Sequence, residues 1–566
     1  MIFISTSNPL FAITAIVMIA GAVSGEAQGH QSRPASKDIE SRQDRSSNNP
    51  ETSKFRRRAH GVVAVFGDRI YYDGGSVSGT GSSSSPPFSP TNSTLYIDLS
   101  KSWSPASVPI SEIARPKPPS TAQSIIIDKY SECFLAWGGI PAPSSPELWR
   151  FCNSGGGDRA AWEKLPSKSD FGDYSRLAHT AYASTKDSGF AFGGRINDPD
   201  SGEWLESSDQ YVSYNFTSKA WASHNLPGSL SSIEDRTLWG AKAVFVPKYG
   251  TNGLVFLLGG ISGQRAQVKD GDAYSGFKTV HFLDPVTRVW HEQETTATSD
   301  GFPKGRYGHC AVGVAGADST YEIYMFGGAN NNESTVDDTV HVLSLPSFTW
   351  SLADSLSVGE KAARYGQACA VVGNSQLLTW GGLGWGEWVD TYLVPDPFDQ
   401  GLGIFDLNTL KKAPGYDAEA APYSAHSDVV HARNTRPTPA EWSSPEVSDL
   451  FETIRAEEPV EDGPQPSSTP VGAIVGGVVG GIALVAIAAA VWFFLLRRRR
   501  TRMRSPPDAH EEDSAAAKTT QYEPVPELVS PPAELHDQYR PAEMTGQGKE
   551  PPRQVHEMDG GYANRS

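Results

Sequence analysis

Positive charge is scarce in this chain of 566 residues: 48 Lys and Arg stand against 65 Asp and Glu, a formal net charge of −17. Contact with phosphates needs a basic surface, so this balance argues against a nucleic-acid partner. The sequence also lacks a nucleophilic triad, a phosphate-binding loop and the Cys/His spacing of a metal site. We therefore expect no enzymatic activity, no cofactor and no metal.

Long apolar runs are also few. One covers Leu10–Ala20 and is followed by the small-x-small pattern Ala22-Val23-Ser24. This pattern predicts a secretory signal peptide over residues 1–24, although no Lys or Arg precedes the run; an uncleaved anchor is the alternative. Residues 25–54 are polar and free of Phe, Tyr and Trp, which predicts a disordered linker.

The other run, 471–496, contains no charged residue and is followed by Arg497–Arg500. At ~1.5 Å per residue it is long enough to cross a ~30 Å hydrocarbon core. The basic flank predicts a transmembrane helix with the C-terminus in the cytosol, in the plasma membrane or another secretory-pathway membrane. A buried core helix is the alternative. The spacing of Gly472, Gly476 and Gly480 indicates a possible homodimer contact within the membrane.

Two further segments have the composition of unfolded chain. Residues 417–470 are rich in Pro, Ser, Glu and Ala and predict an extended stalk outside the membrane. Residues 497–566 are polar and Pro-rich without a minimal PxxP motif, and predict a disordered cytoplasmic tail. Whether this tail transmits a signal stays open.

Between these segments a Gly-Gly doublet returns six times, each time closing a short apolar strand. Self-similarity at a roughly regular period predicts a propeller or another repeat array. The six copies are Gly74-Gly75, Gly138-Gly139, Gly193-Gly194, Gly259-Gly260, Gly327-Gly328 and Gly381-Gly382.

Other residues recur around the doublet. Five of the six copies have an Arg 17 to 23 residues before it, and five units close with a Trp. The arginines are Arg57, Arg176, Arg236, Arg306 and Arg364. The tryptophans are Trp103, Trp162, Trp221, Trp290 and Trp350. The sixth unit lacks the Trp, so its outer strand is the doubtful one.

The repeated order of Arg, doublet, aromatic strand and Trp resembles the kelch repeat, in which each unit is a four-stranded blade of a β-propeller. The resemblance covers residues 55–416 and implies an all-β, six-bladed kelch-type propeller. The expected fold class is therefore this propeller together with one transmembrane helix and disordered flanks. A single blade cannot bury both of its faces, so stacking around a ring creates the core.

The four cysteines suggest two disulfides in an oxidising compartment. Cys133 precedes the second doublet and Cys152 lies in the next, antiparallel strand. Cys310 and Cys369 have opposite parity relative to the repeat Arg, as a bridge between blades five and six requires. Buried free thiols are the alternative for both pairs. On a secretory route the sequons at Asn92, Asn215 and Asn332 become glycosylation sites.

In kelch propellers the loops after the doublets share one face, and here they are long and varied. This layout predicts a binding module for a protein or glycan ligand. Trp385 and Trp388 are candidates for stacking on a sugar or peptide, or else they anchor their loop. The five repeat arginines either hold a ligand carboxylate at the channel mouth or pair locally to hold their blades.

The alternative function is a copper-radical carbohydrate oxidase, because galactose oxidase is built on a kelch-type propeller. That resemblance implies two Tyr and two His on copper, with a Cys linked to one Tyr. Tyr307, His309 and Cys310 are close together, but the first two match the ordinary blade pattern. A receptor with a signalling tail overlaps with the binding module.

Overall fold

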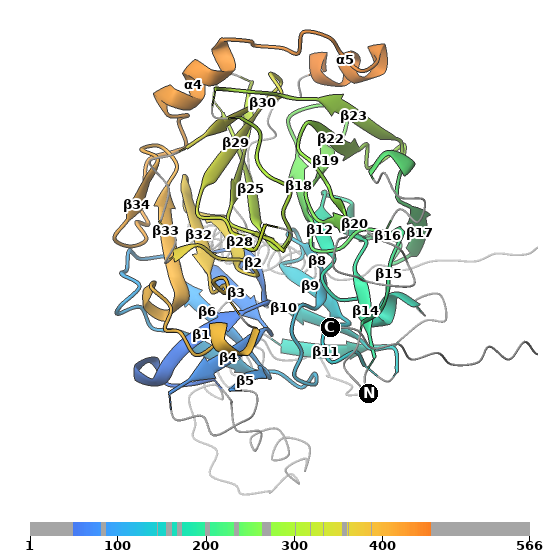
Figure 1. Cartoon of the computed structure of the whole chain (residues 1–566). Coiled ribbons are helices and arrows are strands. Elements are labelled where there is room, and N and C mark those ends of the chain that lie inside the picture. The colour runs from blue at the N-terminus through green and yellow to red at the C-terminus, as the bar shows by residue number, and fades with distance from the viewer. Residues whose placement is uncertain are drawn as a thin grey trace, which may run out of the picture. The chain divides into compact units, whose positions relative to one another are not determined.

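Six sheets, each with four antiparallel strands, are arranged around one axis in the computed structural model (Figure 1). Within residues 49–453 the structure describes all positions except 81–86, 144, 154–160, 167–172, 199–203, 231–236, 263–272, 300, 317–318, 332, 354–358, 360–361 and 387. Among the four antiparallel strands of each blade, the innermost comes first in the sequence and the outermost comes last.

Each sheet is one blade built from one contiguous stretch of chain. Blade one contains β2 (Val62–Phe66), β3 (Arg69–Asp73), β6 (Ser93–Asp98) and β7 (Ser111–Ala114). Blade two contains β8 (Ser124–Asp128), β9 (Cys133–Trp137), β10 (Leu148–Cys152) and β11 (Ala161–Leu165). Blade three contains β12 (Ala181–Ser184), β13 (Ser188–Phe192), β16 (Gln210–Asn215) and β17 (Trp221–Asn225).

The second half of the ring repeats this plan. Blade four contains β18 (Lys242–Val246), β19 (Leu254–Leu258), β22 (Thr279–Leu283) and β23 (Trp290–Glu294). Blade five contains β25 (Cys310–Ala315), β26 (Tyr321–Phe326), β29 (Val340–Leu345) and β30 (Thr349–Leu352), with β24 (Thr296–Ala297) parallel to β30. Blade six contains β31 (Ala368–Val372), β32 (Gln376–Trp380), β33 (Leu402–Asp406) and the short β34 (Lys411–Ala413).

Most of the segments that follow a doublet contain a short two-stranded ribbon or a short helix. Small ribbons follow it in blades one, three, four and five: β4 (Ser76–Gly79) and β5 (Phe88–Pro90), β14 (Arg195–Asn197) and β15 (Trp204–Ser207), β20 (Ile261–Ser262) and β21 (Ala273–Tyr274), β27 (Ala329–Asn330) and β28 (Thr335–Val336). Strand β1 (Phe55–Ala59) pairs with β4. Blade six instead has α3 (Trp388–Thr391) and η7 (Asp399–Gly401), and the remaining 3-10 turns are η1 (Thr52–Lys54), η3 (Asp173–Arg176) and η4 (Gly228–Leu230).

Two closed circuits of backbone hydrogen bonds join the blades. In the inner ring, one residue per blade donates its N–H to the equivalent carbonyl of the preceding blade, at 2.7–3.0 Å: His60 to Gly366, Ala122 to His60, His179 to Ala122, Gly240 to His179, Gly308 to Gly240 and Gly366 to Gly308. Because His60 bonds back to Gly366, the circuit has no open end. The ring therefore closes between blades one and six.

The doublets make the second circuit. The second glycine of each doublet donates its N–H to a carbonyl of the following blade, at 2.7–3.1 Å: Gly75 to Ser120, Gly139 to Leu177, Gly194 to Leu238, Gly260 to Arg306, Gly328 to Arg364 and Gly382 to Arg58. A Cβ on the first glycine would meet the same carbonyl, at 2.1 Å for Gly138 and 2.0 Å for Gly193. The doublet is therefore glycine because a neighbouring backbone occupies the side-chain space.

Apolar side chains fill the space between neighbouring sheets. Between blades six and one, Trp380 lies against Tyr72 at 5.1 Å between ring centroids, and both are buried. At the outer edge Trp103 and Tyr416 exchange backbone hydrogen bonds of 3.0 and 2.9 Å. Trp103 thus joins blade six to blade one instead of lying in a strand of its own blade. This bridge follows β34, the outer strand of blade six. The lack of a Trp in the sixth unit had made that strand doubtful from the sequence.

Both expected disulfides are present. Cys133 and Cys152 are directly opposite residues of β9 and β10, with Cα atoms 4.1 Å apart. Cys310 of β25 and Cys369 of β31 connect blades five and six, with Cα atoms 5.9 Å apart. The first bridge holds a hairpin within one blade, whereas the second joins two blades next to the inner ring.

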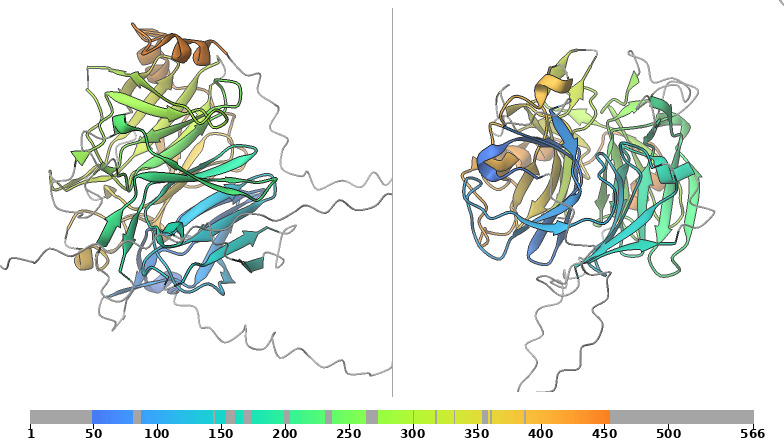
Figure 2. Two further views of the ribbon diagram at one scale, coloured as in Figure 1. Left: turned by 90° about the vertical axis from the view of Figure 1, so that its right-hand side faces the viewer. Right: turned by 90° about the horizontal axis from the view of Figure 1, so that it is seen from below.

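The expected stalk is folded in its first part. Residues 417–453 include α4 (Ser427–Asn434) and α5 (Pro445–Glu452), which lie along the outer edge of the blades (Figure 2). Arg433 forms a buried ion pair with Glu322, and Phe451 packs on Tyr249 and Phe348. Composition alone suggested extended chain here, but the apolar side chains of this segment cover blades four and five.

The expected fold class needs one correction. Within the described part of the chain, no helix is long and apolar enough to cross a membrane. The α-helices α4 and α5 have eight residues each, about 12 Å at ~1.5 Å per residue. The transmembrane helix is therefore unsupported. The segment 471–496, the glycines within it, the signal peptide and the tail all lie outside the described residues.

Substitution of a doublet glycine tests the role of the neighbouring carbonyl. Gly193→Ala places a Cβ 2.0 Å from the Leu238 oxygen, whereas Gly301, with φ of 83°, has no described atom within 4 Å. We expect Gly193→Ala to lower the free energy of unfolding by about 4 kcal/mol or more, and Gly301→Ala by only about 1–2 kcal/mol. Urea unfolding measures both, and equal losses would contradict this explanation of the doublet.

Removal of each disulfide tests the loop-closure contribution. Cys310 and Cys369 are separated by 59 residues and Cys133 and Cys152 by 19. Replacing the first pair by serines should therefore cost about 1 kcal/mol more than replacing the second, because a longer loop gains more entropy in the unfolded chain. Thermal unfolding of the two double variants, each compared with the parent, gives the difference. The opposite order would show that local packing dominates.

Candidate functional site

Five aromatic side chains form a closed collar beside the inner ring. Neighbouring ring centroids are 5.0–6.0 Å apart around the circuit of His60, His179, Trp239, Tyr307 and Tyr365. Trp239, Tyr307 and Tyr365 each precede an inner-ring glycine. Blade two has Thr121 and Ala122 at this level and supplies no aromatic ring. The collar therefore comes from five of the six blades.

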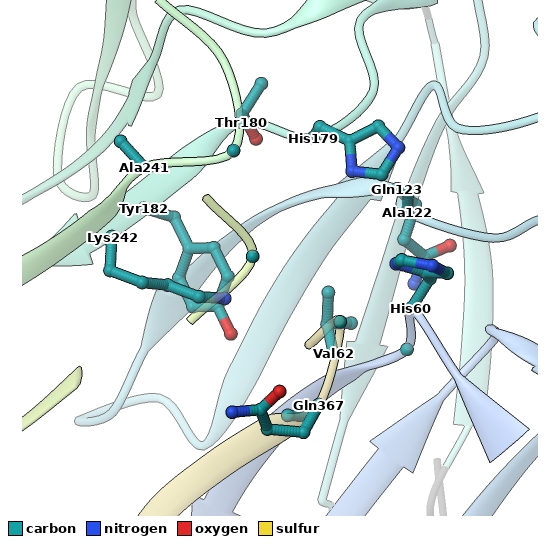
Figure 3. A pocket seen from close by; sticks show the side chains of 15 residues that line it. His60, Val62, Ala122, Gln123, His179, Thr180, Tyr182, Ala241, Lys242 and Gln367 are labelled. Atoms are coloured by element: carbon teal, nitrogen blue, oxygen red, sulfur yellow. The ribbon is translucent and has the colours of Figure 1, made fainter. Parts of the chain in front are cut away.

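Beside the collar, residues from all six blades line a cavity of about 60 Å³. Its lining includes His60, His179, Thr180, Tyr182 and Lys242, and it contains no Asp or Glu (Figure 3). Lys242 stands two residues after Gly240 on β18. Burial lowers the pKa of the Lys242 ammonium to about 8. Among the described residues, no carboxylate forms an ion pair with this ammonium.

The two channel histidines are held neutral. Burial, followed by the charges of Lys242 and Arg195, lowers the pKa of His60 to about 4. Burial also holds the pKa of His179 well below the usual range, with Arg195 the next cause. Arg195 places its guanidinium carbon 3.7 Å from the centroid of the Trp239 ring. Positive charge thus dominates the surroundings of the channel.

Two of the repeat arginines pair within their own blades. Arg306 donates to the Gly327 carbonyl at 3.1 Å and pairs with Asp337 at 2.9 Å. Arg364 does the same with Gly381 at 2.8 Å and Asp396 at 3.0 Å. These contacts fit the local-pairing alternative, since each guanidinium binds the doublet of its own blade.

The other repeat arginines differ. Arg57 donates to the carbonyls of Gly382, Val394 and Pro395, all in blade six. Arg176 ends η3 and is half-buried. Arg236 lies outside the described residues. Binding of an external carboxylate by these arginines stays a prediction.

An apolar patch lies on the segment after the sixth doublet. It consists of Trp385, Val389, Leu393 and Val394, whose side chains are 49, 42, 42 and 55 % exposed. We call it the blade-six patch. Trp388 begins α3 in the same segment, and its side chain is not described. Stacking of Trp385 or Trp388 on a ligand remains a prediction.

Two of the three sequons lie in described chain. Asn92 is half-buried, and the hydroxyl of its Thr94 donates to Asp73. Asn215 ends β16, and its side-chain oxygen accepts hydrogen bonds from the N–H groups of Thr217 and Ser218. Asn332 lies outside the described residues. Glycosylation at all three remains a prediction.

Sequence reasoning missed the collar and Lys242, although a pattern was present. An aromatic residue directly before glycine recurs at Trp239-Gly240, Tyr307-Gly308 and Tyr365-Gly366. Lys242 is the one charged residue at its blade position, where the other blades have Val62, Ser124, Ala181, Cys310 and Ala368. Alignment on the repeat Arg hid both, because the spacing from Arg to the inner ring differs between blades.

Comparison with known proteins supports the repeat assignment. A kelch repeat-containing protein of Arthroderma benhamiae is 24 % identical over 372 residues, covering 57 % of this chain and 52 % of the relative. The chain thus matches about half the length of that curated relative. No protein-family profile matches the chain. Fold and relative both fit a kelch-type propeller.

The buried histidines predict a loss of stability in acid. Between the unfolded pKa of about 6.5 and the folded pKa of about 4, His60 binds a proton only in the unfolded chain. Stability is therefore complete above pH 6.5 and falls as the pH is lowered toward 4. His60→Asn should reduce this slope, by up to about 1.4 kcal/mol per pH unit, since Asn tolerates the φ of 57° found here.

Urea unfolding at several pH values measures the slope. His431→Asn, on the exposed side of α4, provides the matched control and should leave the slope unchanged. An identical slope in the parent and in His60→Asn would contradict the neutral state of the channel histidine.

Proposed function

We propose that the propeller is a protein-binding module and that the blade-six patch is the centre of its binding surface. The blade-six patch is the main support for this proposal, because its apolar side chains are exposed while hydrogen bonds hold its backbone. The kelch-repeat relative supports a binding module in general terms. Its name specifies no ligand, so the choice of a protein ligand depends on the patch itself.

Two arginines of the N-terminal strand hold the backbone of the patch. Arg56 donates to the Leu393 carbonyl at 3.1 Å, and Arg57 to the Val394 carbonyl at 2.9 Å. Between the exposed residues, Tyr392 is fully buried and stacks on Phe88 at 4.1 Å between centroids. The backbone of Leu393 and Val394 is therefore held in place, so little backbone entropy is lost when a partner binds.

The chemistry of the patch favours protein over glycan. Val389, Leu393 and Val394 are aliphatic and exposed, and aliphatic side chains gain most by burial against another apolar surface. A sugar ring instead stacks on a flat aromatic face, which in the described part of this patch only Trp385 supplies. Glycan binding is an outcome of the test below and not part of the proposal.

The oxidase alternative gains no support from the geometry. Cys310, the cysteine next to Tyr307 in sequence, is bonded to Cys369 and has no thiol left for a link to a tyrosine. His309 is fully buried against Phe277 and does not line the channel. We therefore propose a non-enzymatic function.

We also propose that the propeller folds in an oxidising compartment of the secretory pathway. All four cysteines are paired. Structural disulfides of this kind persist in oxidising compartments and are rare in the cytosol of mesophiles. Non-reducing mass spectrometry of the native protein should recover both pairs.

Substitution of the patch tests the proposed surface. In the full-length protein, a photo-crosslinking amino acid at Leu393 should give discrete protein adducts in its native cells. The triple change Val389→Ser, Leu393→Ser and Val394→Ser should reduce recovery of the same adducts, captured through a second crosslinker at Trp385, about tenfold or more, because apolar anchors dominate such contacts. Quantitative mass spectrometry of the adducts is the measurement.

The matched control lies in the β22–β23 turn, where Val286 and Val289 are 61 and 49 % exposed. Val286→Ser with Val289→Ser removes similar apolar surface away from the doublet segments and should leave the adducts unchanged. Equal loss in both variants would contradict a specific surface. A glycan-array signal that disappears in Trp385→Ala while the adducts persist would assign the patch to sugars.

A further inference from the structure

We propose that the central channel binds one compact monovalent anion, such as a halide or a small carboxylate, at the ammonium of Lys242. This site is independent of the blade-six patch, because it lies between the inner strands and shares no residue with it. The proposal depends on three observations: an uncompensated cation, an available hydroxyl donor and a cavity of limited size.

The cation comes first. The lining of the cavity contains Lys242 and no carboxylate. Asp73, a buried carboxylate near Gln123, already forms an ion pair with Arg115 and accepts hydrogen bonds from Gln123 and Thr94. The other cation acting on the channel histidines His60 and His179 is Arg195. A charge removed from water without a partner is costly, and an anion beside Lys242 would offset that cost.

Tyr182 supplies a neutral donor. Its side chain lines the same cavity, and Figure 3 shows it and Lys242 directed toward the interior. The Tyr182 oxygen accepts a hydrogen bond from the Val63 backbone. No described acceptor takes its hydroxyl proton, which is therefore available to a ligand. An ammonium and a hydroxyl that line the same cavity are both hydrogen-bond donors suited to an anion.

The channel also limits what enters. A volume of about 60 Å³ holds a few water-sized groups. Residues from all six blades line the cavity, and the backbone hydrogen bonds of the inner ring hold them in place. A halide or an acetate-sized carboxylate fits this space.

Bromide is the probe for the test. In the full-length protein at constant ionic strength, replacing gluconate by bromide should raise the unfolding temperature and reach saturation. Lys242→Met should abolish the saturable rise. In gluconate alone Lys242→Met should unfold at a higher temperature than the parent, because it removes an unpaired, half-buried charge. Tyr182→Phe should raise the half-saturating bromide concentration about tenfold.

Lys411→Met, an exposed position on β34, is the control for loss of a positive charge and should respond to bromide as the parent does. Crystals of the parent grown in bromide should show an anomalous peak beside the Lys242 ammonium. The proposal is wrong if the parent shows no saturable rise, if Lys242→Met responds as the parent does, or if the peak lies elsewhere. If Lys242→Met fails to fold, the position of the anomalous bromide peak and the bromide titration of Tyr182→Phe test the proposal instead.

Discussion

Each blade depends on its two neighbours for backbone hydrogen bonds that it cannot make alone. The inner ring donates to the preceding blade, and the second glycine of each doublet donates to the following one. A buried backbone group without a partner is costly, so these twelve bonds determine both the spacing and the number of the blades. Any one blade displaced from the ring leaves donors unpaired in both neighbours. The Gly-Gly doublet recurs in every blade because each blade needs this hydrogen bond to its neighbour.

The same constraint builds the channel. Since the inner-ring residues are held by the backbone, the side chains next to them have fixed positions whatever their chemistry. Aromatic residues at five blades form the collar, and a lysine at one blade makes the cavity positive. A symmetric scaffold thus carries an asymmetric interior, because the backbone imposes no requirement on these side chains. Specific chemistry at the axis of this fold needs only a single substitution in one blade.

Sequence reasoning reached the blades and both disulfides because those depend on local spacing. The parity of Cys310 and Cys369 follows from strand alternation, which a sequence displays directly. The collar depends on which residues from separate blades converge, and no local pattern gives that. For 417–453 composition was a poor guide, because a few apolar residues such as Phe451 determine docking and a window average hides them. The repeat arginines were visible, but their partners are distant carbonyls.

Because each blade is made from one uninterrupted stretch of chain, the chain termini could lie between any two blades. No strand is exchanged across the junction between blades one and six, which is held by the Trp103–Tyr416 bridge, side-chain packing and backbone hydrogen bonds. A circularly permuted gene that opens the chain between blades three and four would preserve every sheet and both disulfides. The six blades thus occupy equivalent positions in the closed ring, and the ring itself does not determine which blade comes first in the chain.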